Sequence, residues 1–191
     1  MKIASCLMAL AATVLSLLAT GQARAQSGAT VDPDCILKGF IAQGTAREAF
    51  VRNLPLQHWR VQPNTSEYQY SFLDELYRRK EEGLRDFDLF GAEKFLQCLR
   101  PAATAELPPA ESLVACFAEI DVVLHARQYK ASGGGLAGTK RFARYSLKDA
   151  KRYPQEMFDR IIPKAFALDD PERLQAYREA LMQTCASAKL R

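Results

Sequence analysis

The sequence predicts an all-α protein, a compact bundle of five to seven helices with two disulfides. Apolar residues recur three and four positions apart in most segments, which is the period of a buried helix face. No run of four to eight residues both alternates apolar with polar side chains and is rich in β-branched ones, so we expect little or no sheet. Four cysteines follow an N-terminal export segment, and an even number favours pairing.

The first 25 residues have the layout of a secretory signal peptide. An apolar run covers Ile3–Thr20, and Ala23 and Ala25 stand at the small positions of a cleavage site before Gln26. A permanent membrane anchor is the alternative, because a run of about 18 apolar residues approaches the length that spans a bilayer. We expect cleavage near Ala25, a periplasmic or secreted location, and a single helical domain over residues 26–191.

The mature chain is predicted to be nearly neutral. The 191 residues include 26 basic and 22 acidic side chains, and Lys2 and Arg24 leave with the signal peptide, so 24 basic residues face 22 acidic ones, a net charge of about +2. This balance excludes a strongly basic nucleic-acid binder. An apolar fraction of 48% excludes a wholly disordered chain.

The mature cysteines are predicted to form two disulfides, since an oxidising compartment favours them. A zinc site is the alternative, but it needs closely spaced pairs, and the nearest two cysteines are 18 positions apart. Three pairings are open. Folding two consecutive helices back on each other favours Cys98–Cys116, which leaves Cys35–Cys185 to join the two ends of the fold.

The helices before position 66 are predicted from their end signals. Asp32–Asp34 places an acidic cap before a proline in the first turn. Gly44 interrupts this helix, and Thr45–Glu48 resembles a capping box that restarts a helix up to Pro55. Residues 55–65 contain two prolines and are predicted to form a loop.

The later helices are predicted from caps, prolines and apolar faces. Their expected limits are 66–82 with Gly83 as the C-cap, Asp88 to Pro101, Pro109 to about Lys130 before the break at Ser132–Gly138, Pro154 to a kink or end near Pro163, and a last helix from the Asp170-Pro171 cap. The side chains expected to face the core are Leu37, Phe40, Ile41, Phe50, Val51, Phe72, Leu73, Leu76, Tyr77, Ala92, Phe95, Leu96, Leu99, Leu113, Cys116, Phe117, Ile120, Leu124, Met157, Phe158, Ile161, Ile162, Leu174, Tyr177, Leu181 and Cys185.

No motif predicts catalysis, a metal site or a cofactor. His58 and His125 lack the spaced partners of a metal site, and no H-E-x-x-H or G-x-S-x-G pattern occurs. The helix over 66–82 carries both acidic residues and Arg78, Arg79 and Lys80, and this mixture is typical of a solvated, ion-paired face. The acidic residues are Glu67, Asp74, Glu75, Glu81 and Glu82. A glycosidase that uses two carboxylates alone has no sequence motif and stays an alternative.

A basic segment over residues 126–164 is the strongest candidate for partner binding. It holds ten basic and three acidic residues, whereas residues 101–125 hold four acidic residues and no basic one. Such a charge distribution suits electrostatic steering toward an acidic partner, although a solvated helix face is the alternative. The residues predicted to contact the partner are Lys130, Lys140, Arg141, Arg144 and Tyr145.

The chain resembles the periplasmic immunity proteins that neutralise type VI secretion amidase effectors. The resemblance is carried by the export signal Ile3–Ala25, by Cys35, Cys98, Cys116 and Cys185, and by the absence of catalytic motifs. It implies a small exported helical protein that plugs the active-site groove of a cell-wall amidase, so that the partner is another protein.

The predicted function is therefore that of a periplasmic non-catalytic protein-binding domain, an immunity or inhibitor protein that neutralises a cell-wall-active effector enzyme. A secreted cell-wall hydrolase that uses carboxylates and a membrane-surface adaptor or chaperone are the alternatives. We expect no nucleic acid, no cofactor and no stable membrane span, and a homodimer stays open.

Overall fold

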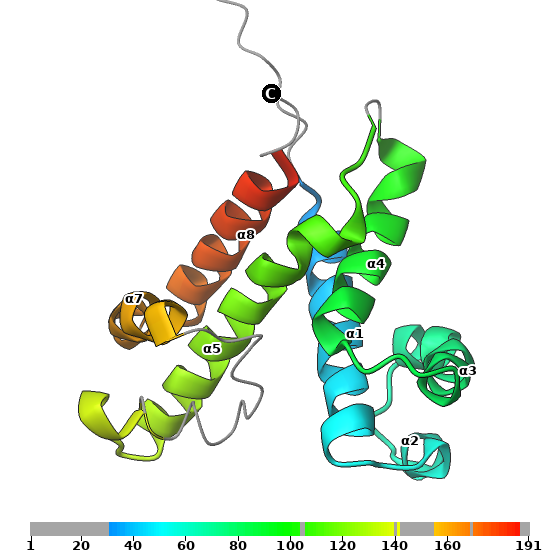
Figure 1. The fold of residues 1–191 in the computed structure, drawn as a ribbon, viewed down its shortest axis with the longest axis horizontal. Helices are drawn as coiled ribbons and strands as arrows, with labels where there is room; N and C mark the ends of the chain where they lie inside the picture. The colour runs from blue at the N-terminus through cyan, green and yellow to red at the C-terminus, as the bar shows by residue number, and fades with distance from the viewer. Residues whose placement is uncertain (1–30, 104–105, 140, 142–154, 169, 188–191) are drawn as a thin grey trace, which may run out of the picture. The chain divides into compact units, whose positions relative to one another are not determined.

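The all-α prediction is confirmed by the computed structural model, which describes residues 31–103, 106–139, 141, 155–168 and 170–187 (Figure 1). None of these residues belongs to a strand, and they fall within one compact unit. The α-helices are α1 (Pro33–Val51), α2 (Leu56–Val61), α3 (Glu67–Glu81), α4 (Phe87–Leu99), α5 (Val114–Ala131), α7 (Gln155–Ala167) and α8 (Pro171–Ser187), and two 3-10 helices, η1 (Arg100–Ala102) and η2 (Ala110–Leu113), lie between α4 and α5. Residues 136–139 and 141 are also helical. The predicted signal peptide and its cleavage site lie outside the described residues.

Several helix ends are set by the local signals that the sequence shows. Asp32 caps α1, because its carboxylate accepts the backbone N–H of Asp34 at 2.9 Å. Ser66 and Gln69 form a reciprocal capping box at the start of α3. Gly83 ends α3 with φ +103°, in the left-handed region that favours glycine.

Gly44 does not interrupt α1, contrary to the prediction. The Thr45 hydroxyl donates to the Ile41 carbonyl at 2.8 Å, within the same helix, instead of capping a new one. A glycine inside a helix costs about 1 kcal/mol. Burial of Ala42, Ala46 and Ala49 on the same helix outweighs that cost, so α1 runs unbroken to Val51.

The predicted loop over residues 55–65 is also wrong, since it contains α2. Trp59 anchors this short helix: its side chain is buried, and its indole N–H donates to the Tyr77 hydroxyl at 3.0 Å. One turn of helix is therefore stabilised by a contact with α3 that local sequence does not reveal.

Two other helix limits differ from the prediction. The helix predicted to begin at Asp88 begins at Phe87, because Asp86 is its cap and accepts the Leu89 N–H at 2.8 Å. Asp88 is itself buried and accepts a hydrogen bond from Gln43. Pro163 lies inside α7, which continues to Ala167.

Two glycines allow α1 and α4 to pack closely side by side (Figure 1). A Cβ on Gly39 would lie 2.8 Å from the Cβ of Phe95 and 2.9 Å from the Cζ of Phe117. A Cβ on Gly91 would lie 2.7 Å from the Cβ of Gln43. The backbones of α1 and α4 therefore approach at a point where only hydrogen fits.

The two disulfides join neighbouring antiparallel helices, and the predicted pairing is wrong. Cys35 at the start of α1 bonds to Cys98 at the end of α4, and Cys116 at the start of α5 bonds to Cys185 at the end of α8. Cysteines at facing ends of antiparallel helices do form bonds, but the bonded helices are not consecutive in the chain. In the fold, α4 pairs with α1, so Cys98 lies beside Cys35 instead of Cys116.

The core consists of two clusters of buried apolar side chains, and both disulfides lie at the second of them. One cluster includes Phe72, Leu76, Phe90, Val122, Phe158, Ile161 and Ile162, and the other includes Cys35, Phe40, Phe95, Phe117, Ile120 and Met182. α5 contributes to both clusters, so it connects the α1–α4 pair with α7 and α8. Within the described part of the chain, none of the helices combines the length and the apolar character needed to cross a bilayer.

Candidate functional site

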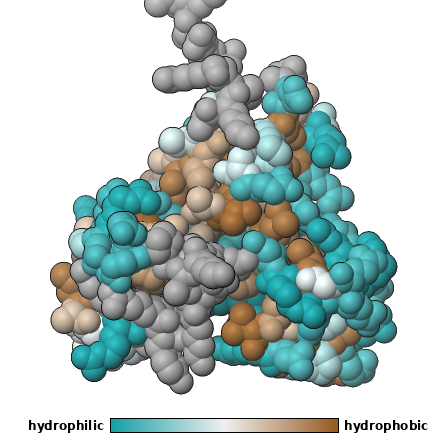
Figure 2. Space-filling view, in the orientation of Figure 1, coloured by the Kyte–Doolittle hydropathy of each residue, from teal (hydrophilic) through white to brown (hydrophobic). Residues whose placement is uncertain are grey.

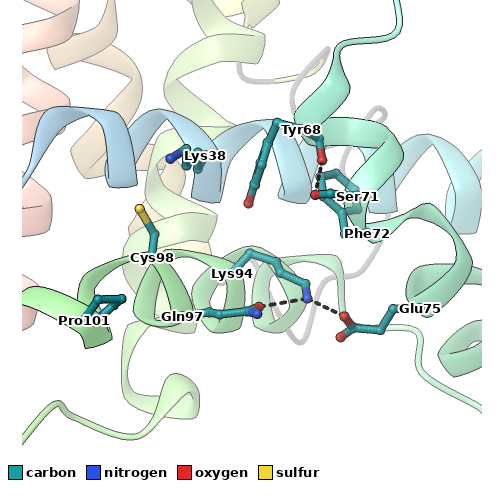
Figure 3. Close-up of a pocket in the computed structure, with 9 residues that line it drawn as sticks. All are labelled: Lys38, Tyr68, Ser71, Phe72, Glu75, Lys94, Gln97, Cys98 and Pro101. Carbon is teal, nitrogen blue, oxygen red and sulfur yellow. Dashed lines mark hydrogen bonds and ion pairs between the residues drawn. The ribbon is translucent and has the colours of Figure 1, made fainter.

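A cavity with a volume of about 300 Å³ lies between α1, α3 and α4 (Figure 3). It is referred to below as the α1–α3–α4 pocket. Its walls are Lys38 of α1, Tyr68, Ser71, Phe72 and Glu75 of α3, Lys94, Gln97 and Cys98 of α4, and Pro101 of η1. Side chains from α1, α3 and α4 thus surround one hollow, which lies beside the Cys35–Cys98 disulfide.

The floor of the pocket is an internal ion pair. Lys94 is 7% exposed, and its ammonium donates to Glu75 Oε2 at 2.5 Å and to Gln97 Oε1 at 3.0 Å (Figure 3). Arg79 Nη1 also lies 3.8 Å from the Glu75 carboxylate. The negative charge of Glu75 is therefore already balanced by the chain itself.

The upper wall of the pocket presents donors. Burial, and then the nearby Glu75 charge, raise the pKa of the Tyr68 phenol to about 12, so its hydroxyl stays protonated and able to donate. The Lys38 ammonium lies 5.9 Å from the centroid of the Tyr68 ring. Neither of these two polar groups has a hydrogen-bond acceptor anywhere in the described residues.

A smaller cavity of about 110 Å³ lies between α1 and α8. Arg178 stacks there on Phe40, with its guanidinium carbon 4.4 Å from the ring centroid. Asp34 and Glu179 share the walls of this cavity, and burial lowers the pKa of Arg178. Because this cavity is smaller and the charge of Glu179 already acts on the Arg178 cation, it is a weaker candidate than the α1–α3–α4 pocket.

The first buried ionic cluster outside the pocket joins α1 to α5. Arg47 Nη1 donates to Asp121 Oδ1 at 2.6 Å, and Arg47 Nη2 donates to His125 Nε2. Arginine has no acceptor, so Nε2 carries no proton, and His125 Nδ1–H donates to the Asp121 carbonyl at 2.8 Å. The cluster therefore holds His125 as a neutral imidazole.

The second cluster joins α5 to α7 and α8. The buried Glu119 carboxylate accepts a hydrogen bond from Arg160 Nη2 at 2.9 Å and another from the Tyr177 hydroxyl. Burial and the Glu119 charge raise the pKa of Tyr177. Glu119 and Asp121, both from the acidic stretch of the sequence, are thus neutralised inside the fold.

We predict that folding stability falls as the pH drops below 6.5, in part through His125. Burial lowers the pKa of His125 from its ordinary 6.5 despite the nearby Asp121, and Arg47 adds to the lowering. Between the lowered and the ordinary pKa the unfolded chain binds the extra proton, so this contribution to stability is complete above 6.5 and is lost below it.

The measurement is urea unfolding between about pH 7 and about pH 5, where histidines titrate. A His125→Gln variant should show a shallower loss of unfolding free energy on acidification than the wild type. His58→Gln, in α2, controls for the removal of a histidine. Equal pH slopes for the wild type and His125→Gln would contradict the prediction.

The predicted partner-binding residues do not form one described site. Lys130 lies near the end of α5, where its ammonium donates to the Phe166 carbonyl at 2.5 Å and lies over the Phe166 ring. Arg141 is helical and exposed. Lys140, Arg144 and Tyr145 lie outside the described residues, so their role stays a prediction.

The α1–α3–α4 pocket was missed by the sequence analysis. Its charged side chains come from three separate helices, and no spacing marks them as one group. Part of the α3 interpretation is confirmed, since Arg78 pairs with Glu82 and Arg60 pairs with Asp74 at the surface. Glu75 on the same helix instead faces the pocket.

The exposed surface of the described residues is mixed in polarity. On the face drawn in Figure 2, hydrophobic areas are separate and lie among hydrophilic ones. The large apolar residues with exposed side chains are Leu37, Val51, Val61, Tyr70, Leu124 and Leu136. The α1–α3–α4 pocket, which has three charged side chains in its walls, is therefore a more distinctive feature of the protein than any apolar area visible in that view.

No three His, Cys, Asp or Glu side chains within the described ranges are grouped so that they could hold a metal ion. Comparison of the chain with family models, with curated proteins and with solved structures finds no match.

Proposed function

We propose that the chain is a non-catalytic protein-binding domain of the periplasm or another oxidising compartment, and that it acts as an immunity or inhibitor protein toward a cell-wall-active enzyme. The observation that carries the proposal is the pair of disulfides, which join α1 to α4 and α5 to α8. Such bonds persist in oxidising compartments. They also hold the helices in place before binding, which reduces the entropy lost when a complex forms.

The placement of the buried charges supports a binding role over a hydrolytic one. A carboxylate-based wall hydrolase needs an acid and a carboxylate that face the substrate. Glu119 and Asp121 instead face Arg160 and Arg47, which neutralise them. The chain uses its buried acids to join helices together.

The proposal is tested with the exported chain, purified with its disulfides formed. Incubated alone with peptidoglycan, it should release no fragments. Added in stoichiometric amount to wall amidases, including any encoded beside its own gene, it should slow fragment release by one of them. Release of fragments by the chain alone would favour the hydrolase, and inhibition of no wall enzyme would overturn the proposal.

Lipid binding distinguishes the proposed inhibitor from the remaining alternative, a membrane-surface adaptor or chaperone. A membrane-surface adaptor with a basic segment should sediment with anionic vesicles, and salt should release it. An inhibitor of a soluble enzyme should stay in the supernatant with both anionic and neutral vesicles. Salt-sensitive sedimentation together with no enzyme inhibition would favour the adaptor.

A further inference from the structure

The α1–α3–α4 pocket has the size of a site for one side chain of a partner. Its volume of about 300 Å³ is at the lower end of the range for small-ligand sites. Its walls come from helices, and Cys98 in the wall is bonded to Cys35, with a Cα–Cα distance of 5.4 Å. The pocket is therefore built on rigid elements and is formed before any ligand arrives.

The hydrogen-bonding groups of the pocket are unbalanced in favour of donors. Across the described residues, the Lys38 ammonium, the Tyr68 hydroxyl and the Gln97 amide N–H₂ have no acceptor. The Gln97 amide oxygen is already used by Lys94. Figure 3 shows the Tyr68 hydroxyl pointing from α3 into the space between α1 and α4. A ligand that fits must therefore bring acceptors.

The charge of the pocket leads to the same conclusion. Lys38 and Lys94 carry two positive charges, and Glu75 carries one negative charge that Lys94 already contacts. Arg79, which lies outside the lining, is paired with Glu93 through both of its terminal nitrogens. The walls thus hold a net charge of +1, and an anionic acceptor would balance it. Hydrogen bonds from an ammonium to a carboxylate are among the strongest in proteins.

We infer that the α1–α3–α4 pocket binds the carboxylate of an aspartate or glutamate side chain of a protein partner, with Lys38 as its ion-pair partner and Tyr68 as a hydrogen-bond donor. The inference rests on the proposed function, for which it names the chemistry of one anchor residue. At many interfaces a few side chains that fill well-packed, desolvated pockets carry most of the binding energy.

The experiment uses the full exported chain and short peptides that are acetylated and amidated, with a single central glutamate or, as the control, glutamine. Binding is followed by backbone amide NMR shifts. The glutamate peptide should shift the amides of residues 38, 68 and 97, and the glutamine peptide should not. Lys38→Met should weaken the binding about tenfold or more, and Tyr68→Phe should weaken it several-fold.

Arg52→Met is the matched control, because Arg52 is an exposed cation that directly follows α1 and lies outside the pocket. It should leave the affinity unchanged. Thermal unfolding of each variant verifies that Lys38→Met is folded. Equal binding of the two peptides, equal loss in Lys38→Met and Arg52→Met, or binding only of a free C-terminal carboxylate or of acetate would overturn the inference.

The inhibition assay keeps this inference separate from the proposed function. If the wild type inhibits a wall enzyme and Lys38→Met inhibits it equally well, the pocket inference fails and the proposed function stands. If the glutamate peptide binds with the expected Lys38 dependence and no wall enzyme is inhibited, the proposed function fails and the pocket stands as a carboxylate site.

Discussion

A Cys116→Ala/Cys185→Ala variant should lose about 4 kcal/mol of unfolding free energy, and a Cys35→Ala/Cys98→Ala variant should lose nearly the same amount. Each disulfide restricts the unfolded chain by closing a loop, and the loops span 69 and 63 residues. The loop-entropy relation gives about 4 kcal/mol for both. Similar loops therefore predict similar losses.

The size of the two losses distinguishes the observed pairing from the one predicted by sequence. If the bonds were Cys98–Cys116 and Cys35–Cys185, each of the two variants would remove one cysteine from both bonds. The same relation assigns those loops about 3 and about 5 kcal/mol, so each variant would lose about 8 kcal/mol. Equilibrium unfolding in guanidinium measures the losses. The slope of free energy against denaturant should also rise in the variants, since their unfolded chains expose more surface.

Digestion under non-reducing conditions tests the pairing directly. A peptide that contains Cys35 should be linked to one that contains Cys98, and reduction should separate them. Fully reduced wild type is the control for the effect of losing both bonds together. Recovery of a Cys98–Cys116 peptide, or a loss in either variant as large as that of the fully reduced wild type, would contradict the prediction.

Features whose physical cause lies within a few residues of the chain, such as helix ends, were predicted correctly from the sequence. Asp32, Ser66 and Gly83 mark helix ends correctly, because capping depends on hydrogen bonds and backbone angles within a few residues. The predicted core residues Phe72 and Phe117 are buried, since helical periodicity selects the face that turns inward. The prediction is wrong for Leu37, Val51 and Leu124, which are exposed, because periodicity does not show how wide the covered part of a helix is.

Features that depend on which helices pack against each other were predicted wrongly. The disulfide pairing is wrong because sequence order suggested that α4 and α5 lie level, whereas α4 packs on α1 through Gly39 and Gly91. Two glycines inside helices are visible in the sequence, but nothing local says that they face each other. The same limit conceals α2, whose stability depends on Trp59 meeting Tyr77.

The candidate site was less predictable than the fold. The sequence drew attention to the basic segment over residues 126–164 because charge is easy to count along a chain. In the structure, Arg160 of that segment pairs with Glu119, so part of its charge is used internally. Lys38, Tyr68 and Lys94 become one pocket only through the packing of α1, α3 and α4.

Gly39→Ala and Gly91→Ala should each lower the free energy of unfolding by about 1–3 kcal/mol, the cost of overpacking a well-packed core. The added methyl of Gly39→Ala would meet Phe95 and Phe117, and that of Gly91→Ala would meet the Cβ of Gln43 at 2.7 Å and the Gly39 carbonyl at 3.0 Å. Backbone and Cβ atoms cannot rotate away, so α1 and α4 must separate.

Gly44→Ala provides the matched control on the same helix as Gly39. Gly44 is exposed, it lies within α1, and a Cβ there would meet no atom within 4 Å. Alanine should therefore stabilise the protein by about 0.5–1 kcal/mol, because it costs less entropy than glycine to hold in a helix. The same substitution thus has opposite expected signs at two positions five residues apart.

Opposite signs of the change in unfolding free energy identify packing as the cause, since helix propensity alone would stabilise all three variants. Urea unfolding measures the three free energies, and the midpoint should shift with little change in slope if the native state stays compact. Stabilisation by Gly39→Ala or Gly91→Ala would mean that α1 and α4 do not approach at these residues. Cys35 lies one turn before Gly39 on α1. The Cys35–Cys98 bond would then lack the helix packing that brings its two sulfurs together.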